Sequence, residues 1–389
     1  MMDLLTIVPY YTGHLCEALD SRPEIQLEVG AIRYYLDPEC FTRMALRPSP
    51  GLDIVSRMRG LPRPLRRVFK TAEYLVNLLG LAFRFAVHKP DVLHVQFLPL
   101  VLFGLPFEVW FLRYAKSLGV KIVYTVHNVL PHESFERHRS LYSRLYAFAD
   151  GLICHDVTAQ QRLVEEFGCD ASRISVIPHG QLLAPSQQTT QAAARQRLGI
   201  AQDVRLVLWQ GILRPYKGVE FLLKSWCQIA AGTPDARLAI VGTGEDALLE
   251  EVRNQVEALE LSSSVQLELR FVSVAELEEF HTAADVLVYP YAEATTSGAL
   301  LTGIGYGKAI VASRLPAFEE ILRDGDNALL VNYGDTDELA KALRRLITEP
   351  DLRRGLASRL EQNRQHEPGW DVIAQQTAAC YAELLEVPA

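Results

Sequence analysis

The chain has 389 residues, which is long enough for two domains of ordinary size. Hydrophobic residues make up 49% and charged residues 22%, so a disordered chain is excluded. With 39 basic against 47 acidic residues the net charge is −8, which gives no reason to expect a nucleic-acid partner. The six cysteines are scattered without a C-x-x-C pair. We therefore expect reduced thiols, without a disulfide framework, a zinc ribbon or another metal site.

The sequence suggests neither a secretory signal nor a membrane span. No basic stretch follows Met1, so we expect a cytoplasmic protein. Residues 92–112 are about as long as a bilayer span and are mostly apolar. A buried strand followed by a buried helix is the better interpretation, because the segment also contains His94, Gln96, Pro99, Pro106 and Glu108.

Short apolar runs alternate with longer amphipathic stretches, a pattern typical of βα units on a parallel sheet. Such strands are apolar throughout because helices cover both faces of the sheet. In the first half we expect strands at residues 4–8, 92–95, 121–126, 151–154 and 174–177. In the second half we expect them at residues 205–209, 236–241, 265–269, 286–289 and 309–312.

Residues 180–202 are rich in Gln, Ala and Thr and indicate a linker with a short helix. We therefore predict two Rossmann-like domains, over residues 1–185 and 200–367, and a final amphipathic helix within residues 368–389. The apolar side of that helix is expected to carry Trp370, Val372, Ile373, Tyr381 and Leu384. Two such halves imply a cleft between them, since parallel sheets bind ligands outside the carboxyl ends of their strands.

The strongest motif is G-x-x-R-P-Y-K-G, over residues 211–218, directly after a predicted strand. Gly211 allows a sharp turn, and Arg214 and Lys217 then lie three residues apart where the next helix begins. Two cations beside free backbone N–H groups form an anion site suited to a diphosphate. The alternative is a pair of solvated surface cations.

A second motif, Y-P-Y-A-E-A-T-T-S-G-A-L, also follows a predicted strand and leads into an apolar helix. Ser297 or Thr296 is the expected N-cap, and Gly298 would let a ligand approach the first helical N–H groups. Glu293, just before this end, is suited to accept hydrogen bonds from sugar hydroxyls. The alternative is an ordinary capping loop.

Two further polar turns follow strands. In T-V-H-N-V-L-P-H, His127 is the stronger candidate for a sugar or acceptor contact, and His132 the weaker. Gly242 and Gly244 form a Gly-rich turn suited to approach a nucleotide base or ribose, although a G-x-G without a third glycine is a weak signal. The P-H-G turn at residues 178–180 is predicted to be structural or to line the cleft.

The spaced motifs G-x-x-R-P-Y-K-G, V-G-T-G-E, Y-x-E-x-x-x-S-G-A-L-L-T and G-K-A-I-V-A-S resemble the retaining glycosyltransferase family four, which has the GT-B fold. T-V-H-N and the helix at Trp370, which would return to the first domain, extend the resemblance over nearly the whole chain. The family implies transfer from a nucleotide-sugar donor bound by the second domain, with retention of configuration and without a metal or other cofactor. Arg214 and Lys217 would stabilise the leaving diphosphate, Glu293 would lie by the donor sugar, and His127 would line the sugar site from the acceptor-side domain.

The chain departs from the family pattern at three places. The family pairs two glutamates eight residues apart, but Leu301 and Thr302 stand eight and nine residues after Glu293. Because the second glutamate usually holds the donor ribose, the resemblance leaves open how this chain binds the ribose. Ile212, rather than arginine, directly follows the strand-end glycine. The usual Gly-Gly loop of the first domain is replaced by residues 9–14. R-P-Y-K-G and S-G-x-L-x-T mark a subgroup of the family.

A basic run without an acid between Asp53 and Glu73 is interleaved with leucine, valine and phenylalanine. It is either a solvated face or a surface that docks to an anionic membrane, where a lipid-linked acceptor would be presented. The run consists of Arg57, Arg59, Arg63, Arg66, Arg67 and Lys70.

We therefore expect a glycosyltransferase that acts on a glycan or lipid-linked acceptor, in polysaccharide biosynthesis at the inner face of the membrane. The alternatives are a nucleotide-sugar epimerase of the same fold and a non-catalytic sugar-nucleotide-binding protein. A nicotinamide oxidoreductase is disfavoured because no G-x-G-x-x-G follows an early strand.

Overall fold

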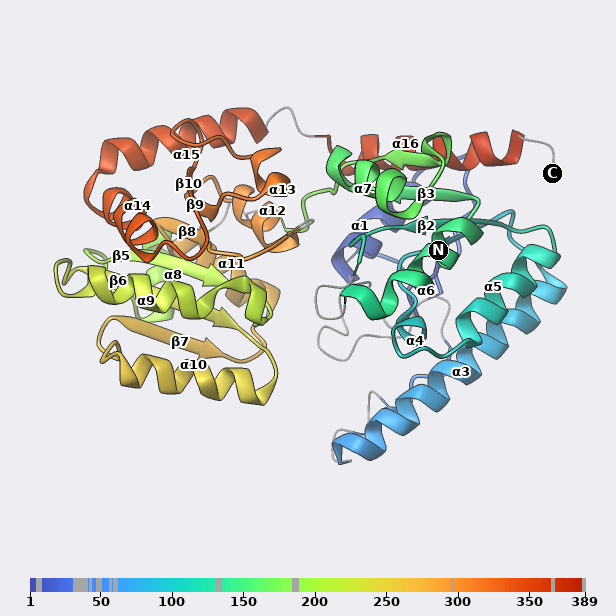
Figure 1. The fold of residues 1–389 in the computed structure, drawn as a ribbon, viewed down its shortest axis with the longest axis horizontal. Coiled ribbons are helices and arrows are strands. Elements are labelled where there is room, and N and C mark those ends of the chain that lie inside the picture. The colour runs from blue at the N-terminus through green and yellow to red at the C-terminus, as the bar shows by residue number, and fades with distance from the viewer. Residues whose placement is uncertain are drawn as a thin grey trace. The chain divides into compact units, whose positions relative to one another are not determined.

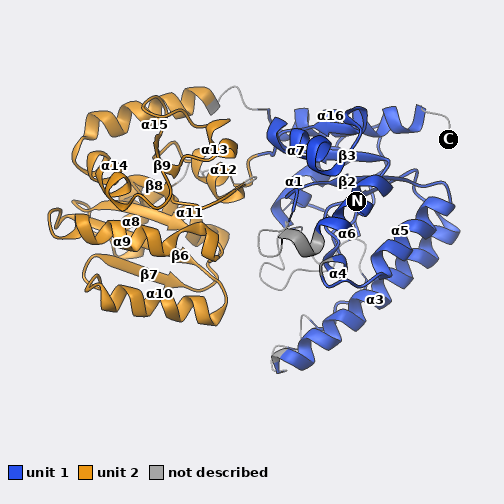
Figure 2. Cartoon of the chain, viewed as in Figure 1, with its two compact units in different colours: residues 1–180, 368–389 blue, residues 181–367 orange. Residues whose placement is uncertain are grey.

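A computed structural model describes residues 1–4, 9–30, 41, 44–46, 51–55, 58, 62–130, 135–183, 189–294, 297–364 and 368–386. The chain forms two compact units (Figure 2). Unit 1 comprises Met1–Gly180 and Pro368–Ala389, and unit 2 comprises Gln181–Glu367. Helices and strands alternate along the chain in both units (Figure 1). The described residues contain no helix that is both long and apolar enough to cross a membrane.

Unit 1 is built on a parallel sheet with the order β1-β2-β3-β4. Beside β1, the backbone N–H of Met2 donates to the carbonyl of His94 at 2.8 Å. The strands are β1 (Val92–Val95), β2 (Lys121–Thr125), β3 (Gly151–Cys154) and β4 (Ile174–Val176). The helices are α1 (Pro9–Asp20), α3 (Arg63–Val87), α4 (Pro99–Leu102), α5 (Phe107–Ser117), α6 (Phe135–Phe148), α7 (Val157–Phe167), η2 (Ala171–Arg173) and α16 (Trp370–Glu386).

The sheet of unit 1 is covered on both faces, which explains why its strands are apolar throughout. Leu93, Ile122 and Leu152 point into a core shared with α3, α5, α6 and α7. Residues of the opposite parity, such as Val123 and Ile153, are also buried. On that second face α16 packs against α1 and β2.

Helix α16 is the final helix predicted from the sequence, and it belongs to unit 1. The Tyr381 hydroxyl lies 2.5 Å from Nδ1 of His94 on β1. A Cβ added to Gly180 would lie 2.5 Å from the Trp370 ring, so this glycine lets the ring approach the backbone. Ile373 is buried, whereas Val372, predicted on the apolar side, is exposed. The actual buried face is completed by Ala374, Thr377 and Cys380.

Unit 2 has a six-stranded parallel sheet with the order β10-β9-β8-β5-β6-β7. The strands are β5 (Arg205–Gln210), β6 (Ala236–Gly242), β7 (Val265–Leu269), β8 (Val286–Tyr289), β9 (Ala309–Ser313) and β10 (Leu329–Val331). The helices are α8 (Gln191–Leu198), η3 (Pro215–Lys217), α9 (Val219–Ala230), α10 (Asp246–Ala258), α11 (Val274–Ala283), α12 (Gly298–Ile304), α13 (Pro316–Glu319), α14 (Thr336–Thr348) and α15 (Pro350–Arg364).

Alternate residues of these strands enter two separate cores. Val207 and Trp209 join a cluster with α9, α10 and α14. Leu206 and Leu208 join the other, with α8, α11 and α12. The sheet is therefore a middle layer between two helical layers, the doubly wound architecture predicted from the sequence.

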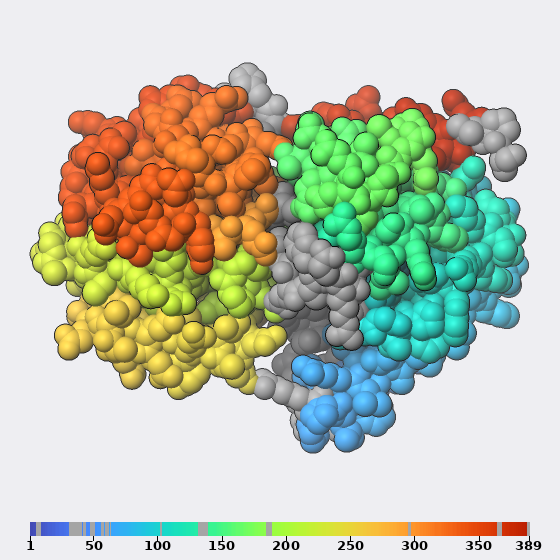
Figure 3. Space-filling model, viewed as in Figure 1, coloured from blue at the N-terminus to red at the C-terminus, as the bar shows by residue number. Residues whose placement is uncertain are grey.

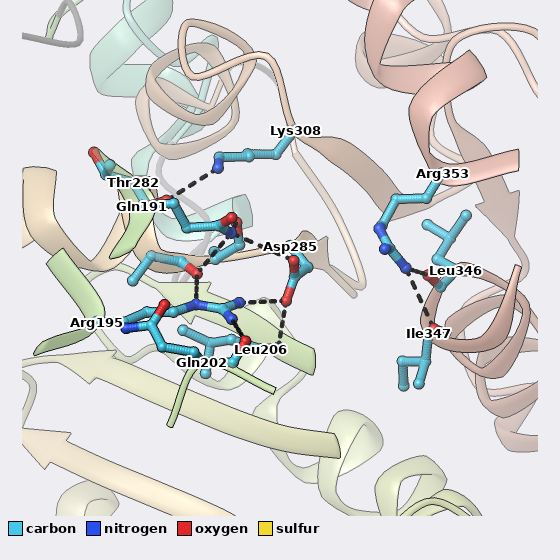
Figure 4. A network of polar contacts seen from close by, with 12 residues as sticks. Gln191, Arg195, Gln202, Leu206, Thr282, Asp285, Lys308, Leu346, Ile347 and Arg353 are labelled. Carbon is cyan, nitrogen blue, oxygen red and sulfur yellow. Dashed lines mark hydrogen bonds and ion pairs between the residues drawn. The ribbon is translucent and has the colours of Figure 1, made fainter. Parts of the chain in front are cut away.

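The short helix expected in the linker is α8, and polar contacts fix it to unit 2 (Figure 4). The buried Arg195 guanidinium donates to Oδ2 of Asp285 at 2.7 Å and to the carbonyls of Ala283 and Gln202. The same Asp285 oxygen accepts the N–H of Leu206 at the start of β5. Because these bonds join α8 to β5 and β8, unit 2 begins well before the predicted residue 200.

Nine of the ten predicted strands have counterparts in the sheets. Four have the predicted bounds (β1, β3, β7 and β8), and the others differ by one residue at the carboxyl end. The predicted strand 4–8 falls mainly on residues 5–8, which lie outside the described ranges. Strand β10 is absent from the prediction because three residues are too few to show a periodic pattern.

Candidate active site

The strand order of unit 2 marks one place on the sheet as a ligand site. From the central strand β5, the chain proceeds through β6 and β7 on one side and then through β8, β9 and β10 on the other. Such a reversal opens a crevice outside the carboxyl ends of the strands, where doubly wound sheets bind nucleotides. The predicted motifs at residues 211–218 and 290–298 follow β5 and β8, the two strands that flank this point.

Two glycine turns meet at the ends of β5 and β6. Gly211 and Gly242 have φ angles of 147° and 151°, a region that favours glycine. A Cβ on Gly242 would lie 1.8 Å from the carbonyl oxygen of Gly211. Farther along the two loops, the N–H of Leu213 donates to the carbonyl of Thr243 at 2.7 Å. The two predicted Gly-containing turns are thus a single packed unit.

An added Cβ on Gly242 would meet the backbone carbonyl of Gly211, which cannot move aside as a side chain can. We therefore expect Gly242→Ala to destabilise unit 2 by about 2 kcal/mol. Gly232→Ala is the matched control, since an added Cβ there comes no closer than 3.9 Å to the carbonyl oxygen of Ile229. Urea unfolding of both variants measures the difference. Equal stabilities would show that the turn relaxes at no cost.

Arg214 and Lys217 lie at the two ends of the η3 turn. The Lys217 ammonium lies over Gly211, 2.8 Å from the position of an added Cβ, and 5.5 Å from the centroid of the Tyr291 ring. Burial, and secondarily the charge of Arg214, lowers the pKa of Lys217 to about 8. Arg214 is more exposed, and its Nη1 lies 3.6 Å from Oε1 of Glu245. The two cations are held together where an anion would relieve their repulsion.

The loop after β8 packs directly on this turn. The N–H of Ala292 donates to the carbonyl of Tyr216 at 2.7 Å. Gly218, with a φ of 68°, approaches the carbonyl of Pro290 so closely that an added Cβ would lie 1.8 Å from it. Glu293, one residue beyond Ala292, is partly exposed. The structure therefore brings three predicted segments together in unit 2: the loops after β5, β6 and β8.

The start of α12 is organised as expected. The Ser297 hydroxyl accepts the N–H of Leu300 at 3.1 Å, so Ser297 is the N-cap. Packing accounts for the glycine at position 298, because a Cβ added to Gly298 would lie 2.9 Å from Cδ1 of Leu182. Thr296 lies outside the described residues. Leu301 and Thr302, which stand near the family's second glutamate position, are both buried.

Unit 1 gathers histidines at the carboxyl ends of its strands. His127 follows β2, His155 follows β3 and His179 follows β4. Nδ1 of His127 lies 3.2 Å from Nε2 of His155, and Nε2 of His127 lies 2.8 Å from Oε1 of Gln96. The Tyr11 ring lies 4.8 to 5.2 Å from all three imidazole rings. His132 lies outside the described residues.

Burial keeps these imidazoles neutral. It lowers the pKa of His155 to about 3, that of His179 to about 4 and that of His127 well below its usual value. Three neutral imidazoles are a ligand type of Zn²⁺, and their nitrogens lie within 4.8 Å of one another. Tetrahedral zinc needs its nitrogen ligands about 3.3 Å apart, so the cluster as it stands is too wide. The prediction that the chain holds no metal stays a prediction.

Three residues of this cluster were not predicted from the sequence as site residues: Tyr11, Gln96 and His155. Tyr11 lies within α1, where residues 9–14 replace the expected glycine loop. A usable signal was present: a polar side chain directly follows β1 and β3 (Gln96 and His155), as His127 follows β2. Since parallel strands end at one edge, these residues had to meet.

Comparisons with known proteins identify both halves of the chain. Residues 14–181 match the family model described as Glycosyltransferase Family 4, and residues 204–349 match the model described as Glycosyl transferases group 1. The chain thus carries a Glycosyltransferase Family 4 domain followed by a Glycosyl transferases group 1 domain. The family 4 domain lies in unit 1 and the group 1 domain in unit 2.

Curated relatives of these family 4 and group 1 domains include two D-inositol 3-phosphate glycosyltransferases. The one from Geodermatophilus obscurus is 30% identical over 54% of this chain, and the one from Nocardioides sp. is 28% identical over 60%. The aligned regions are 48% and 53% of the lengths of those relatives, so the match spans about half of each.

Two solved structures share the fold over almost the full length. The crystal structure of Anabaena Alr3699/HepE in complex with UDP and glucose has a TM-score of 0.77 and covers 98% of both chains at 17% identity. A glycosyltransferase from Rickettsia africae has a TM-score of 0.74, covering 100% of this chain and 98% of its own at 14% identity. The fold is that of the GT-B glycosyltransferases, as predicted.

Proposed function

We propose that the chain transfers a sugar from a nucleoside diphosphate donor to a glycan or lipid-linked acceptor, with retention of configuration and without a metal ion. The observation that carries this proposal is the pair Arg214 and Lys217 at the switch point of unit 2, with the Lys217 ammonium over Gly211. Two cations beside a glycine turn are suited to bind a diphosphate and would supply the charge that a metal otherwise provides.

In the proposed reaction the bond between the anomeric carbon and the diphosphate oxygen breaks. The acceptor oxygen forms the new glycosidic bond, and its proton passes to the leaving phosphate. The largest cost is the negative charge that develops on the diphosphate, and preorganised Arg214 and Lys217 stabilise it most in the transition state. Glu293 is proposed to accept hydrogen bonds from the donor sugar.

Gly242, Gly244, Ser297, Gly298 and Thr296 are proposed to line the donor site around these cations. The buried Leu301 and Thr302 offer no carboxylate to the ribose, so another group must bind it. His127 belongs to unit 1 and the cations belong to unit 2. The role of His127 beside the transferred sugar therefore stays a prediction.

We propose UDP as the nucleotide, because the fold neighbour Alr3699/HepE was crystallised with UDP and with UDP-glucose. A lipid-linked acceptor would place the protein peripherally at a membrane. The basic run over residues 57–70 supports this, and within its described part Arg63, Arg66, Arg67 and Lys70 lie in the first turns of the helix α3. The relatives named above are transferases, and none of them is an epimerase.

The test is incubation with labelled UDP-sugars, with and without a panel of polyprenyl-linked and soluble glycan acceptors. We expect acceptor-dependent release of UDP and an α-linked product from an α-linked donor, read by the anomeric coupling in NMR. Epimerised donor in the absence of acceptor would overturn the proposal. So would tight nucleotide binding, seen as a thermal shift, without hydrolysis or transfer.

A further inference from the structure

The outer face of α3 is apolar over its whole length. More than a third of the large hydrophobic side chains exposed in the described part of the chain belong to this one helix. Their exposed fractions run from 46% at Phe69 to 76% at Val87. The set, which we call the outer stripe, is Leu65, Val68, Phe69, Val76, Leu79, Phe83 and Val87.

The outer stripe is continuous around the helix axis as well as along it. At 3.6 residues per turn its seven positions fall within about 100° of arc. Tyr74, Leu78 and Phe85 on the opposite side of α3 are buried in unit 1. The helix therefore has two apolar faces, of which only the inner one is covered by the unit's own core. Single exposed apolar side chains are ordinary, but a contiguous stripe marks an interaction site.

The N-terminal turns of α3 carry cations on the side of the helix away from the outer stripe. At 100° per residue Arg66 lies about 60° beyond one edge of the stripe and Lys70 about 100° beyond it, while Arg67 lies on the opposite side of the helix. Glu73 is the only acid on the helix, and its carboxylate accepts the backbone N–H groups of Ile54 and Val55. The first turns of α3 are thus amphipathic, with apolar side chains on the outer stripe and cations on the other side, in a chain whose net charge is −8.

Two exposed aromatic side chains lie on neighbouring segments. Trp110 on α5 is 55% exposed and Phe103, just after α4, is 79% exposed. Helix α5 packs against both α3 and α4. Figure 1 shows α3 running along unit 1 next to α5, and Figure 3 shows part of α3, in light blue, at the surface of unit 1.

We propose that the outer stripe of α3 docks on an anionic phospholipid bilayer, with the helix lying in the plane of the interface. A helix of 25 residues is about 37 Å long and presents the pattern of interfacial helices, in which leucine and phenylalanine enter the acyl boundary and Lys and Arg meet the headgroups.

This inference deepens the proposed function by naming the surface from which a lipid-linked acceptor is reached. It extends the predicted basic run toward Val87 and makes apolar insertion the main contact. The test uses the full chain with vesicles and contains neither donor nor acceptor. Vesicle binding can therefore fail while transfer to a soluble acceptor succeeds, and the reverse outcome is equally visible.

The experiment is co-sedimentation with vesicles of phosphatidylcholine alone and of phosphatidylcholine with about 30% phosphatidylglycerol. We expect binding to the anionic vesicles, weakening at about 0.5 M salt as the surface charge is screened. Leu79→Glu with Phe83→Glu should reduce the partition coefficient about tenfold or more. Arg66→Ala with Arg67→Ala and Lys70→Ala should remove the preference for phosphatidylglycerol.

Val157→Glu is the matched control, because Val157 is 54% exposed on α7 of the same unit. It should bind vesicles as the unchanged chain does. Leu79 and Phe83 are more than 70% exposed, so their replacement should leave thermal unfolding unchanged. Equal sedimentation with and without phosphatidylglycerol would overturn the proposal. So would normal binding by the Leu79→Glu, Phe83→Glu chain, or a dimer that dissociates on this substitution while vesicles remain unbound.

Discussion

Replacing Lys217 with methionine should lower the rate of sugar transfer by about 100-fold or more, the usual cost of removing one preorganised charge from a developing anion. Methionine keeps the apolar stem beside Gly211 and removes only the ammonium. The loss should appear in kcat, because this charge is needed most in the transition state. Arg214→Ala, which removes a more exposed cation, should cost about tenfold or more.

Lys224→Met is the control for this experiment. Lys224 is an exposed lysine on α9 that pairs with Glu220, and its loss should leave transfer near normal. Near-normal rates for both Lys217→Met and Arg214→Ala would exclude the phosphate assignment. The pH profile gives a second readout, since the pKa of Lys217 is about 8 in the unliganded chain. The cation is present below this pH and lost above it, so kcat/KM should fall above pH 8, and Lys217→Arg should abolish that decline.

Acidification from pH 7 to pH 5 should destabilise unit 1 far more than unit 2. Burial lowers the pKa of His94 and His155 to about 3 and that of His179 to about 4, so these rings take up protons near pH 6.5 only in the unfolded chain. Their contribution to stability is present above about pH 6.5 and is lost as the pH falls toward the folded pKa. Each of these three histidines should lower the free energy of unfolding by about 2 kcal/mol between pH 7 and pH 5. His127 acts in the same direction.

One buried carboxyl in unit 1 opposes this trend. Burial raises the pKa of Glu108 to about 7, so between pH 7 and pH 5 this carboxyl takes up a proton in the folded chain but hardly at all in the unfolded chain. That protonation stabilises the folded unit by about 2 kcal/mol. The net loss for unit 1 is therefore about 4 kcal/mol or more, a large part of the stability of an ordinary domain. In unit 2, His281, with a pKa lowered to about 4, contributes about 2 kcal/mol.

Hydrogen–deuterium exchange of the full chain at the two pH values separates the units. Amides of β1 to β4 should lose protection by more than those of β5 to β9. His179→Gln should reduce the loss of unit 1 stability between pH 7 and pH 5 by the contribution of one histidine, about 2 kcal/mol. Parallel losses in both units would show that the buried histidines do not set the acid stability.

The architecture was predictable because doubly wound sheets produce apolar runs that the chain repeats at regular intervals. The donor-side turns were predictable for the same reason, since Gly211 directly follows β5 and Lys217 belongs to the same motif. The histidine cluster was only partly predictable. Tyr11 reaches it from α1, and Trp370 of α16 packs on Tyr11. No local pattern shows which helix residues will cover the edge of a sheet.

The outer stripe of α3 was predictable only in part for a different reason. The interleaved Leu65, Val68 and Phe69 pointed to an interaction surface, but the pattern over residues 74–87 is apolar on both sides of the helix. A sequence shows that two faces are apolar, and only the tertiary packing decides which one is left uncovered. Here the choice is made by Tyr74 and Phe85, which enter the core of unit 1.

The placement of α16 has a consequence for how the chain folds as it is synthesised. Unit 2 is built from one continuous stretch, whereas unit 1 needs both the first 180 residues and the helix Trp370–Glu386. While unit 2 is synthesised and folds, α16 is not yet present to cover the second face of the unit 1 sheet. The contacts of Gly180 with Trp370 and of His94 with Tyr381 form only after α16 has been made. The half of the protein that is made first is therefore the half that is finished last.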